Sequence, residues 1–209
     1  KSLGLTKKDF VILFVGRLAE EKNVKFLIES HKALIDKNYN VKLIIVGDGP
    51  DKEAYEEYAA SLGLDKDVIF TGKASWDAMP CYYHIADVFA TASKTETQGL
   101  TIIEAMASNV VPVCMKDEAF QSMVTEDLNG LFFETQEEYQ KQIEFLYDNP
   151  KELSRIDNQA RIQAEHYGSR GYALSVLEVY DRAIKTKKEE YRFGIFSKIY
   201  KGIKEMFKW

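Results

Sequence analysis

Two carboxylates and a helix start meet in the segment from residue 93 to residue 107. The segment reads SKTETQGLTIIEAMA, and Glu96 and Glu104 have seven residues between them. Gly99 permits a turn ahead of a helical pattern, so we expect several backbone amides at a helix N-terminus, those of Gln98, Gly99, Leu100 and Thr101. Such amides donate to phosphate or sugar oxygens, whereas carboxylates accept from hydroxyls. A sugar nucleotide presents both kinds of group, so the segment predicts a site for such a molecule.

A second interpretation makes Glu96 a solvated loop charge and Glu104 a helix-surface residue. Glu104, however, lies among apolar neighbours, namely Ile102, Ile103, Ala105, Met106 and Ala107. A carboxylate in such a helix costs free energy unless polar groups satisfy it. The functional interpretation is therefore favoured for this pair.

Two cations follow the first apolar run, in the segment GRLAEEKN from Gly16 to Asn23. Gly16 permits a sharp turn, and Asn23 is an N-cap candidate for the next helix. Arg17 and Lys22 would add a guanidinium and an ammonium beside that helix end, where a diphosphate binds well. The segment alone fits a pair of surface charges equally well, so both interpretations stay open.

A second glycine-containing turn, GDGP at residues 47–50, directly follows another apolar run. It begins like the GxGxxG dinucleotide fingerprint, but Lys52 occupies the place of the third glycine, which weighs against nicotinamide or flavin binding. Gly47 and Gly49 serve either a tight turn that needs glycine for its backbone or the close approach of a ligand. The chain has no Walker A motif, so it is not a P-loop NTPase.

Alternating apolar runs and helical patterns must position these loops. The runs, rich in Val and Ile and typical of strands covered on both faces, are residues 11–16, 41–47, 68–72, 88–93, 111–116 and, more weakly, 130–134. Helical patterns cover residues 23–37, 51–62, 76–86, 100–109, 136–147, 150–167 and 170–188. Repeated strand–helix units predict an α/β fold with a doubly wound, mostly parallel sheet and C-terminal helices. In such sheets ligands bind outside the carboxyl ends of the strands, where these loops lie.

Composition restricts the class of protein further. The chain has 209 residues, 45% of them hydrophobic, and begins at Lys1, which suggests an excised or processed chain. We expect neither a signal peptide nor a membrane span, and two cysteines without a pairing pattern favour a reducing compartment. The three histidines lack metal-ligand spacing, so no metal is expected. Residues 182–209 carry a net charge of +6 and residues 1–181 carry −11, which argues against nucleic-acid binding by the folded body.

These motifs, in this order and spacing, resemble the C-terminal domain of glycosyltransferase family 4, which has the GT-B fold. The resemblance rests on GRLAEEKN, GDGP, FTG at residues 70–72 and the Glu96/Glu104 pair, and it covers about residues 10–180. It implies a Rossmann-like donor-binding domain at residues 1–188, a tail at 189–209 and an N-terminal acceptor-binding domain that this chain lacks. Because catalysis in this fold takes place between two domains, we expect the chain alone to be nearly inactive.

The resemblance also implies a role for each site residue. Arg17 and Lys22 would hold the donor diphosphate and stabilise the charge on the leaving group, whereas Glu104 would accept from the ribose hydroxyls. Glu96 would contact hydroxyls of the transferred sugar and is counted with Arg17 and Lys22 as catalytic. Further donor-binding positions are Gly16, Gly47, Gly49, Gly72, Lys73, Gln98, Gly99, Leu100 and Thr101, with residues 70–73 near the base. Family members retain anomeric configuration and need no metal or other cofactor, since the two cations and the helix dipole neutralise the phosphates.

Two positions depart from the common family pattern, because Gln98 replaces an aromatic residue and Asn109 replaces a glycine. The form ETQGLT resembles the branch that glucosylates diacylglycerol in the membranes of Gram-positive bacteria. We therefore expect transfer of a hexose, glucose from UDP-glucose, to a membrane lipid such as diacylglycerol. Two alternatives are the same chemistry on a capsule, wall or protein-linked glycan, and a non-catalytic nucleotide-binding partner subunit.

The basic tail, residues 189–209, reads EEYRFGIFSKIYKGIKEMFKW. Its apolar residues recur at helical spacing, and lysines fill other positions, namely Lys198, Lys201, Lys204 and Lys208. A basic amphipathic helix of this kind lies at an anionic membrane surface or, alternatively, packs against the missing N-terminal domain. The first alternative is favoured, which would place the protein in the cytoplasm, peripherally on the inner face of the cell membrane.

Overall fold

The computed structural model describes residues 3–93, 99–168, 171, 173 and 176–187. The chain divides into two units, Lys1–Glu165 and His166–Trp209. In the second unit residues 176–187 are helical, as the pattern over 170–188 predicts, whereas the tail at 189–209 lies outside the described residues. No helix in the described part of the chain is long and apolar enough to span a bilayer.

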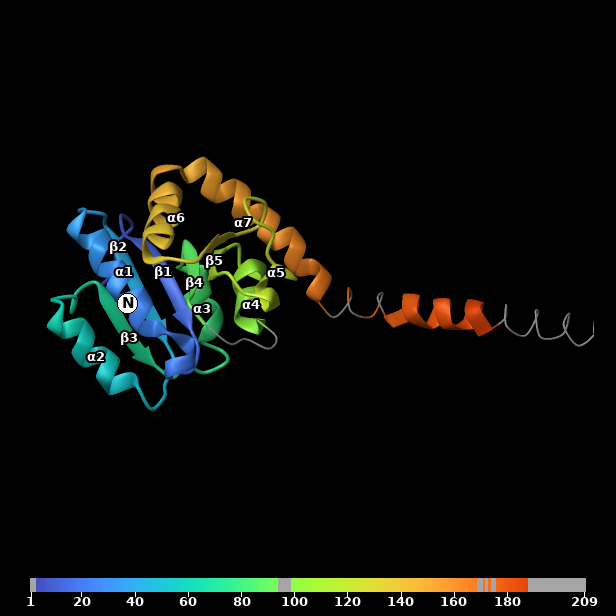
Figure 1. Ribbon diagram of the computed structural model, residues 1–209, viewed down its shortest axis with the longest axis horizontal. Helices are drawn as coiled ribbons and strands as arrows, with labels where there is room; N and C mark the ends of the chain where they lie inside the picture. The colour runs from blue at the N-terminus through green and yellow to red at the C-terminus, as the bar shows by residue number, and fades with distance from the viewer. Residues whose placement is uncertain (1–2, 94–98, 169–170, 172, 174–175, 188–209) are drawn as a thin grey trace, which may run out of the picture. The chain divides into compact units, whose positions relative to one another are not determined.

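Six parallel strands form one sheet in the order β3, β2, β1, β4, β5, β6 (Figure 1). The strands are Phe10–Val15 (β1), Val41–Val46 (β2), Val68–Gly72 (β3), Val88–Thr91 (β4), Val111–Met115 (β5) and Leu131–Phe133 (β6). Along β1, Ile12 and Phe14 enter one hydrophobic cluster, and Val11 and Leu13 enter the other. Burial on both faces explains the continuous apolar runs in the sequence. The predicted doubly wound parallel sheet is therefore confirmed.

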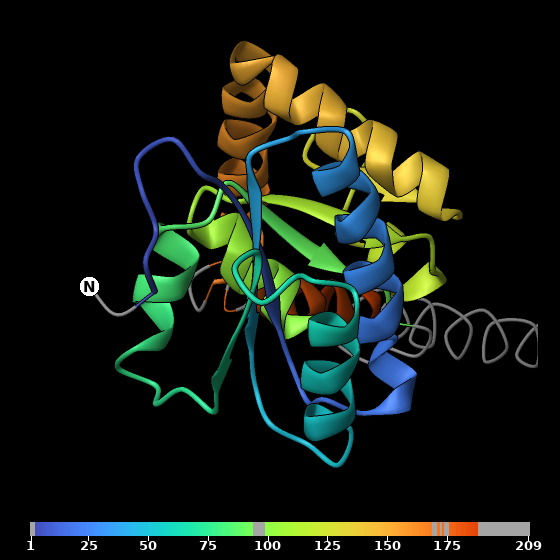
Figure 2. The ribbon, with the colours of Figure 1, turned by 90° about the vertical axis from the view of Figure 1, so that its left-hand side faces the viewer.

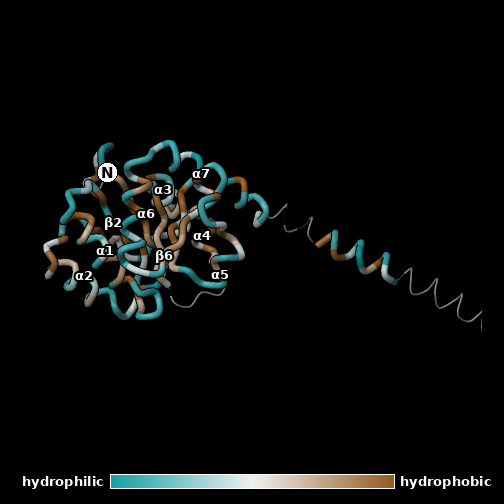
Figure 3. Tube along the Cα trace, turned by 45° about the horizontal axis from the view of Figure 1, so that its top comes forward, coloured by the Kyte–Doolittle hydropathy of each residue, from teal (hydrophilic) through white to brown (hydrophobic). Residues whose placement is uncertain are grey.

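Helices cover both faces of this sheet (Figure 2). They are α1 (Val24–Asp36), α2 (Lys52–Ser61), α3 (Met79–His84), α4 (Leu100–Ala107), α5 (Glu118–Gln121), α6 (Gln136–Asp148) and α7 (Pro150–Ala164), with 3-10 turns at Glu20–Lys22 and Glu165–Tyr167. Helices α1, α2 and α6 pack in one cluster, α3, α4 and α5 pack in the other, and α7 contributes to both. When the chain is coloured by hydropathy, the apolar segments of the unit Lys1–Glu165 lie mostly in its interior (Figure 3).

Several element ends differ from the predictions. Helix α3 begins at Met79 rather than at residue 76, and Pro80 lies in its first turn, where proline is tolerated. Helix α4 ends at Ala107 rather than at residue 109, and Asn109 adopts a left-handed backbone with φ of 58°. Strand β4 ends at Thr91 rather than at residue 93. Sequence patterns predict that an element exists more reliably than they predict its first and last residues, because the conformation of one or two residues decides where an element ends.

Two local features of the helix starts also differ from expectation. Asn23 is the N-cap of α1, as predicted, but its backbone is left-handed and its side chain makes no capping hydrogen bond. Helix α5 was not predicted, because four residues carry no helical period. Its start is marked instead by Asp117, whose carboxylate accepts from the Ala119 amide at 2.9 Å.

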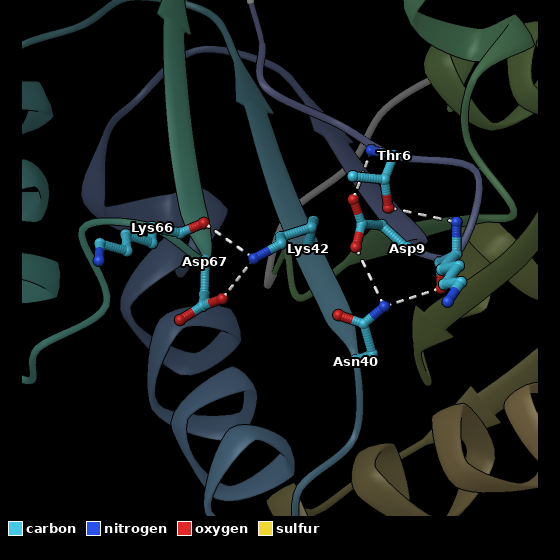
Figure 4. Close-up of polar contacts among 7 residues, drawn as sticks. Thr6, Asp9, Asn40, Lys42, Lys66 and Asp67 are labelled. Atoms are coloured by element: carbon cyan, nitrogen blue, oxygen red, sulfur yellow. Dashed lines mark hydrogen bonds and ion pairs between the residues drawn. The ribbon is translucent and has the colours of Figure 1, made fainter.

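Polar contacts join the amino-terminal ends of β1, β2 and β3, at the opposite end of these strands from the predicted site (Figure 4). Lys42 at the start of β2 donates to the carboxylate of Asp67 before β3, with an N···O distance of 2.6 Å. The carboxylate of Asp9 before β1 accepts from the Thr6 amide at 2.6 Å and from the Asn40 side chain at 3.0 Å. We therefore assign these polar residues at the amino-terminal ends of the strands a structural role.

His31 on α1 is fully buried, and its ring nitrogens make no hydrogen bond with the described residues. Burial lowers the pKa of His31 from 6.5 to about 4, and the charge of Asp67 opposes this shift. Between these two pH values the unfolded chain binds a proton that the folded chain does not. We therefore expect this histidine to lower the free energy of unfolding by about 1.4 kcal/mol for each pH unit below 6.5, down to about pH 4.

Urea unfolding measured between pH 4 and pH 6.5 tests this expectation. His31→Leu should flatten the dependence, because the substitution removes the titrating ring and leaves no partner unsatisfied. His84→Leu is the matched control, since His84 is exposed. An unchanged slope in His31→Leu would show that other groups cause the loss of stability in acid.

Candidate functional site

A cavity of about 650 Å³ opens at the carboxyl ends of β1, β2 and β3. Five predicted site residues line it, namely Gly16, Arg17, Gly47, Gly49 and Lys73. Three further lining residues were not among the predicted site residues, namely Asp48, Ala74 and Met79. Asp48 and Ala74 directly follow the predicted residues Gly47 and Lys73. Their positions in the same loops were therefore the one sign in the sequence that they belong to the site. The structure thus brings the first, second and third strand-to-helix loops together at one opening.

Backbone contacts join the loops after β1 and β2. The Leu18 amide donates to the Asp48 carbonyl at 3.0 Å, and the Asp51 amide donates to the Leu18 carbonyl at 3.1 Å. A Cβ atom on Gly49 would lie 2.2 Å from the Leu18 carbonyl oxygen, and one on Gly47 would lie 1.8 Å from that of Gly16. Both glycines of GDGP are therefore required by the backbone, which confirms the interpretation of this segment as a tight turn that needs glycine. They line the cavity in addition.

Gly72 connects the third loop to the same region. It ends β3 with φ of 72°, a left-handed conformation that favours glycine, and its carbonyl accepts from the Gly47 amide at 3.0 Å. Lys73 follows it, exposed and on the cavity wall. Of the segment expected near the base, residues 70–73, Lys73 therefore lies on the cavity wall.

The two predicted cations take different positions. Arg17 is exposed and lines the cavity. Lys22 is half-buried at the end of the 3-10 turn, and its ammonium donates to the Ser93 hydroxyl at 3.4 Å. Ser93 follows β4, which is the neighbour of β1 on the side away from β2. Lys22 therefore reaches across the point where the strand order reverses, which is the usual ligand site of a doubly wound sheet.

Helix α4 begins on the far side of this reversal point. Gly99 is its N-cap with φ of 56°, and Leu100 and Thr101 form its first turn, as predicted. Amides in the first turn have no acceptor within the helix and point toward solvent or ligand. Glu96 and Gln98 lie outside the described residues, so their predicted roles stay predictions.

Glu104 is half-buried on α4, and it has the partner that its apolar surroundings require. The Tyr83 hydroxyl on α3 donates to Glu104 Oε2 at 2.7 Å. Tyr83 is only 3% exposed, and burial, followed by the hydrogen bond to Glu104, raises its pKa well above the ordinary value. The sequence argument that Glu104 needs a partner was thus correct, but nothing in the sequence pointed to Tyr83, which is 21 residues away.

The arrangement suits an anion with hydroxyls attached. Arg17 and Lys22 offer positive charge at one side of the reversal point, and the α4 amides and Glu104 offer donors and an acceptor at the other. Among the described residues, no three His, Cys, Asp or Glu side chains gather as metal ligands.

Comparisons with known proteins agree with this geometry. The family described as Glycosyl transferases group 1 matches residues 1–163. Alpha-monoglucosyldiacylglycerol synthase of Acholeplasma laidlawii is 35% identical over 178 residues, which are 85% of this chain and 45% of that protein. The protein of the same name from Streptococcus pneumoniae (strain ATCC BAA-255 / R6) is 29% identical over 171 residues, 80% of this chain and 39% of that protein.

A solved structure shares the fold. The crystal structure of Anabaena HepE in complex with UDP-glucose matches with a TM-score of 0.74 and 22% identity, over 83% of this chain and 49% of that one. The expected GT-B architecture is thereby confirmed for this unit. The chain spans less than half of the length of both synthases. With the family match extending over residues 1–163, the chain belongs to the Glycosyl transferases group 1 family.

Proposed function

We propose that this chain is the nucleotide-sugar-binding half of a retaining hexosyltransferase. The observation that carries this proposal is the placement of charge at the strand-order reversal. Lys22 reaches Ser93 across that point, Arg17 lines the adjoining cavity, and Glu104 stands on the helix that begins beyond it. A degenerate, non-catalytic relative would have no reason to keep both cations and the carboxylate in this arrangement.

Each group has a role in this proposal. Arg17 and Lys22 bind the diphosphate and stabilise the negative charge that grows on it as the sugar leaves. Glu104 accepts from the ribose hydroxyls, and Glu96 holds hydroxyls of the transferred sugar. The two cations and the N-terminus of α4 supply the positive charge, so transfer needs no resident metal or other cofactor.

We propose UDP-glucose as the donor and a membrane lipid such as diacylglycerol as the acceptor. The names of both synthases support the lipid and the sugar, and the UDP-glucose complex of HepE supports the donor. Glucose is α-linked in UDP-glucose, so an α-glucosyl product, as those names state, corresponds to retention. The acceptor would reach the cleft from the inner membrane surface, where the basic tail at 189–209 would bind peripherally.

Labelled UDP-glucose, supplied with a bacterial lipid extract and, in a parallel reaction, with a glycan and cell-wall fraction, tests the proposal. The protein in both reactions carries this chain and its acceptor-binding half. We expect label in a glucosyldiacylglycerol, and none when Glu104 is replaced by alanine. Label found only in water-soluble or wall glycan would transfer the proposal to a glycan acceptor. No product of either kind would refute the enzymatic role.

A further inference from the structure

We propose that Tyr83 is a positioning residue, which orients the carboxylate of Glu104 so that its other oxygen accepts from the ribose of the donor. This inference rests on the proposed function, and it extends the site to a residue that does not touch the substrate. It is carried by the contact between α3 and α4, where the Tyr83 hydroxyl lies 2.7 Å from Glu104 Oε2.

The ring of Tyr83 is fixed by packing. It lies in the hydrophobic cluster that contains Ile102 and Ala105 of α4, and its centroid is 6.3 Å from that of Phe89 in β4. Because the ring cannot move without disturbing this cluster, its hydroxyl marks a fixed point beside the half-buried Glu104. A long, flexible side chain such as glutamate gains a defined orientation from a fixed donor of this kind.

The hydrogen-bond inventory leaves one carboxylate oxygen for a ligand. The Tyr83 hydroxyl has a single proton, and the Thr101 carbonyl, at 3.4 Å, is a much poorer acceptor than Glu104 Oε2 at 2.7 Å. No described residue donates to Oε1 of Glu104. A carboxylate that is held through one oxygen can accept from a vicinal diol through the other. Burial also keeps the proton on Tyr83 near neutral pH, because it raises the pKa of this residue.

Helix α3 links this contact to the cavity. Met79, in its first turn, lines the cavity, and Tyr83 lies one turn further along the same helix. The helix therefore sets the cavity wall and the orientation of Glu104 together. If Tyr83 had only a structural role, any acceptor would satisfy its hydroxyl. Loss of the hydroxyl would then weaken the binding of a nucleotide equally with and without its ribose hydroxyls.

Titration calorimetry with two nucleotides separates these roles. The probes are UDP and 2′,3′-dideoxyuridine 5′-diphosphate, which lacks both ribose hydroxyls. We expect Tyr83→Phe to weaken UDP binding about fivefold to tenfold and to leave the affinity for the dideoxy nucleotide unchanged. Tyr82→Phe is the matched control, because it removes a hydroxyl from the preceding residue of the same helix, and it should change neither affinity.

A double-mutant cycle with Glu104→Ala separates loss of the hydrogen bond from a change of fold, since a change of fold would weaken UDP binding in both backgrounds. In the Glu104→Ala background, Tyr83→Phe should produce no further loss of UDP affinity, since the oriented group is already gone. Equal weakening of both nucleotides by Tyr83→Phe, or unchanged UDP affinity, would overturn the positioning role while leaving the donor site intact. An unsubstituted chain that does not bind UDP would overturn the proposed function and this inference with it.

Discussion

Replacing Arg17 by alanine is expected to weaken the binding of UDP to this chain about 10-fold to 100-fold. The guanidinium lines the cavity, and hydrogen bonds to charged groups contribute about 1.5–3 kcal/mol, which corresponds to this range. Guanidinium and phosphate also match in geometry, so two parallel hydrogen bonds are lost together. Lys22→Ala should act in the same direction, because its ammonium stands at the same reversal point of the sheet.

Arg155→Ala is the matched control for the loss of a guanidinium. Arg155 is exposed on α7, where it contacts Glu152 and the Asp127 carbonyl and does not line the cavity. Its removal should leave the affinity for UDP unchanged. If Arg17→Ala and Arg155→Ala had equal effects, the diphosphate would bind elsewhere than at the end of β1.

Gly49→Ala should lower the free energy of unfolding by about 4 kcal/mol, which is a large effect for one methyl group. The added Cβ would lie 2.2 Å from the Leu18 carbonyl oxygen, a backbone atom that accepts from the Asp51 amide and cannot rotate away. The loops after β1 and β2 would have to separate, with loss of their mutual hydrogen bonds. In thermal unfolding followed by circular dichroism, the midpoint should fall by about 8–16 °C.

Gly63→Ala distinguishes this steric effect from the general cost of replacing glycine. Gly63 has φ of 72°, but no atom lies within 4 Å of the position that its Cβ would take. Only the left-handed backbone is strained there, which costs about 1–2 kcal/mol. Similar losses in the two variants would contradict the close approach of the two loops.

Much of the fold was predictable because its strands are buried on both faces. Continuous apolar runs, such as residues 41–47, admit few other interpretations when helical patterns alternate with them. The same periodicity could not give α5, which is too short to show a period, or the end of α4. The pairing order of the strands depends on contacts that are distant in sequence, so no local pattern gives it.

The site was predictable to the level of its loops and not to the level of its contacts. The family resemblance indicated that Arg17 and Lys73 belong to the donor site, and both line the cavity. The apolar helix around Glu104 indicated that this carboxylate needs a partner. The identity of that partner, Tyr83, depends on how α3 packs against α4. The contact of Lys22 with Ser93 likewise joins residues 71 positions apart. No local pattern carries such information.

The donor site is tested by the heat of binding of UDP to the unsubstituted chain, measured in a buffer with a metal chelator. We expect saturable binding of one UDP per chain in the absence of metal, with the affinity lowered by Arg17→Ala and by Glu104→Ala. Binding that appears only when a divalent cation is added would contradict the metal-independent site. If neither UDP nor UDP-glucose gave any heat of binding, the donor site itself would be contradicted.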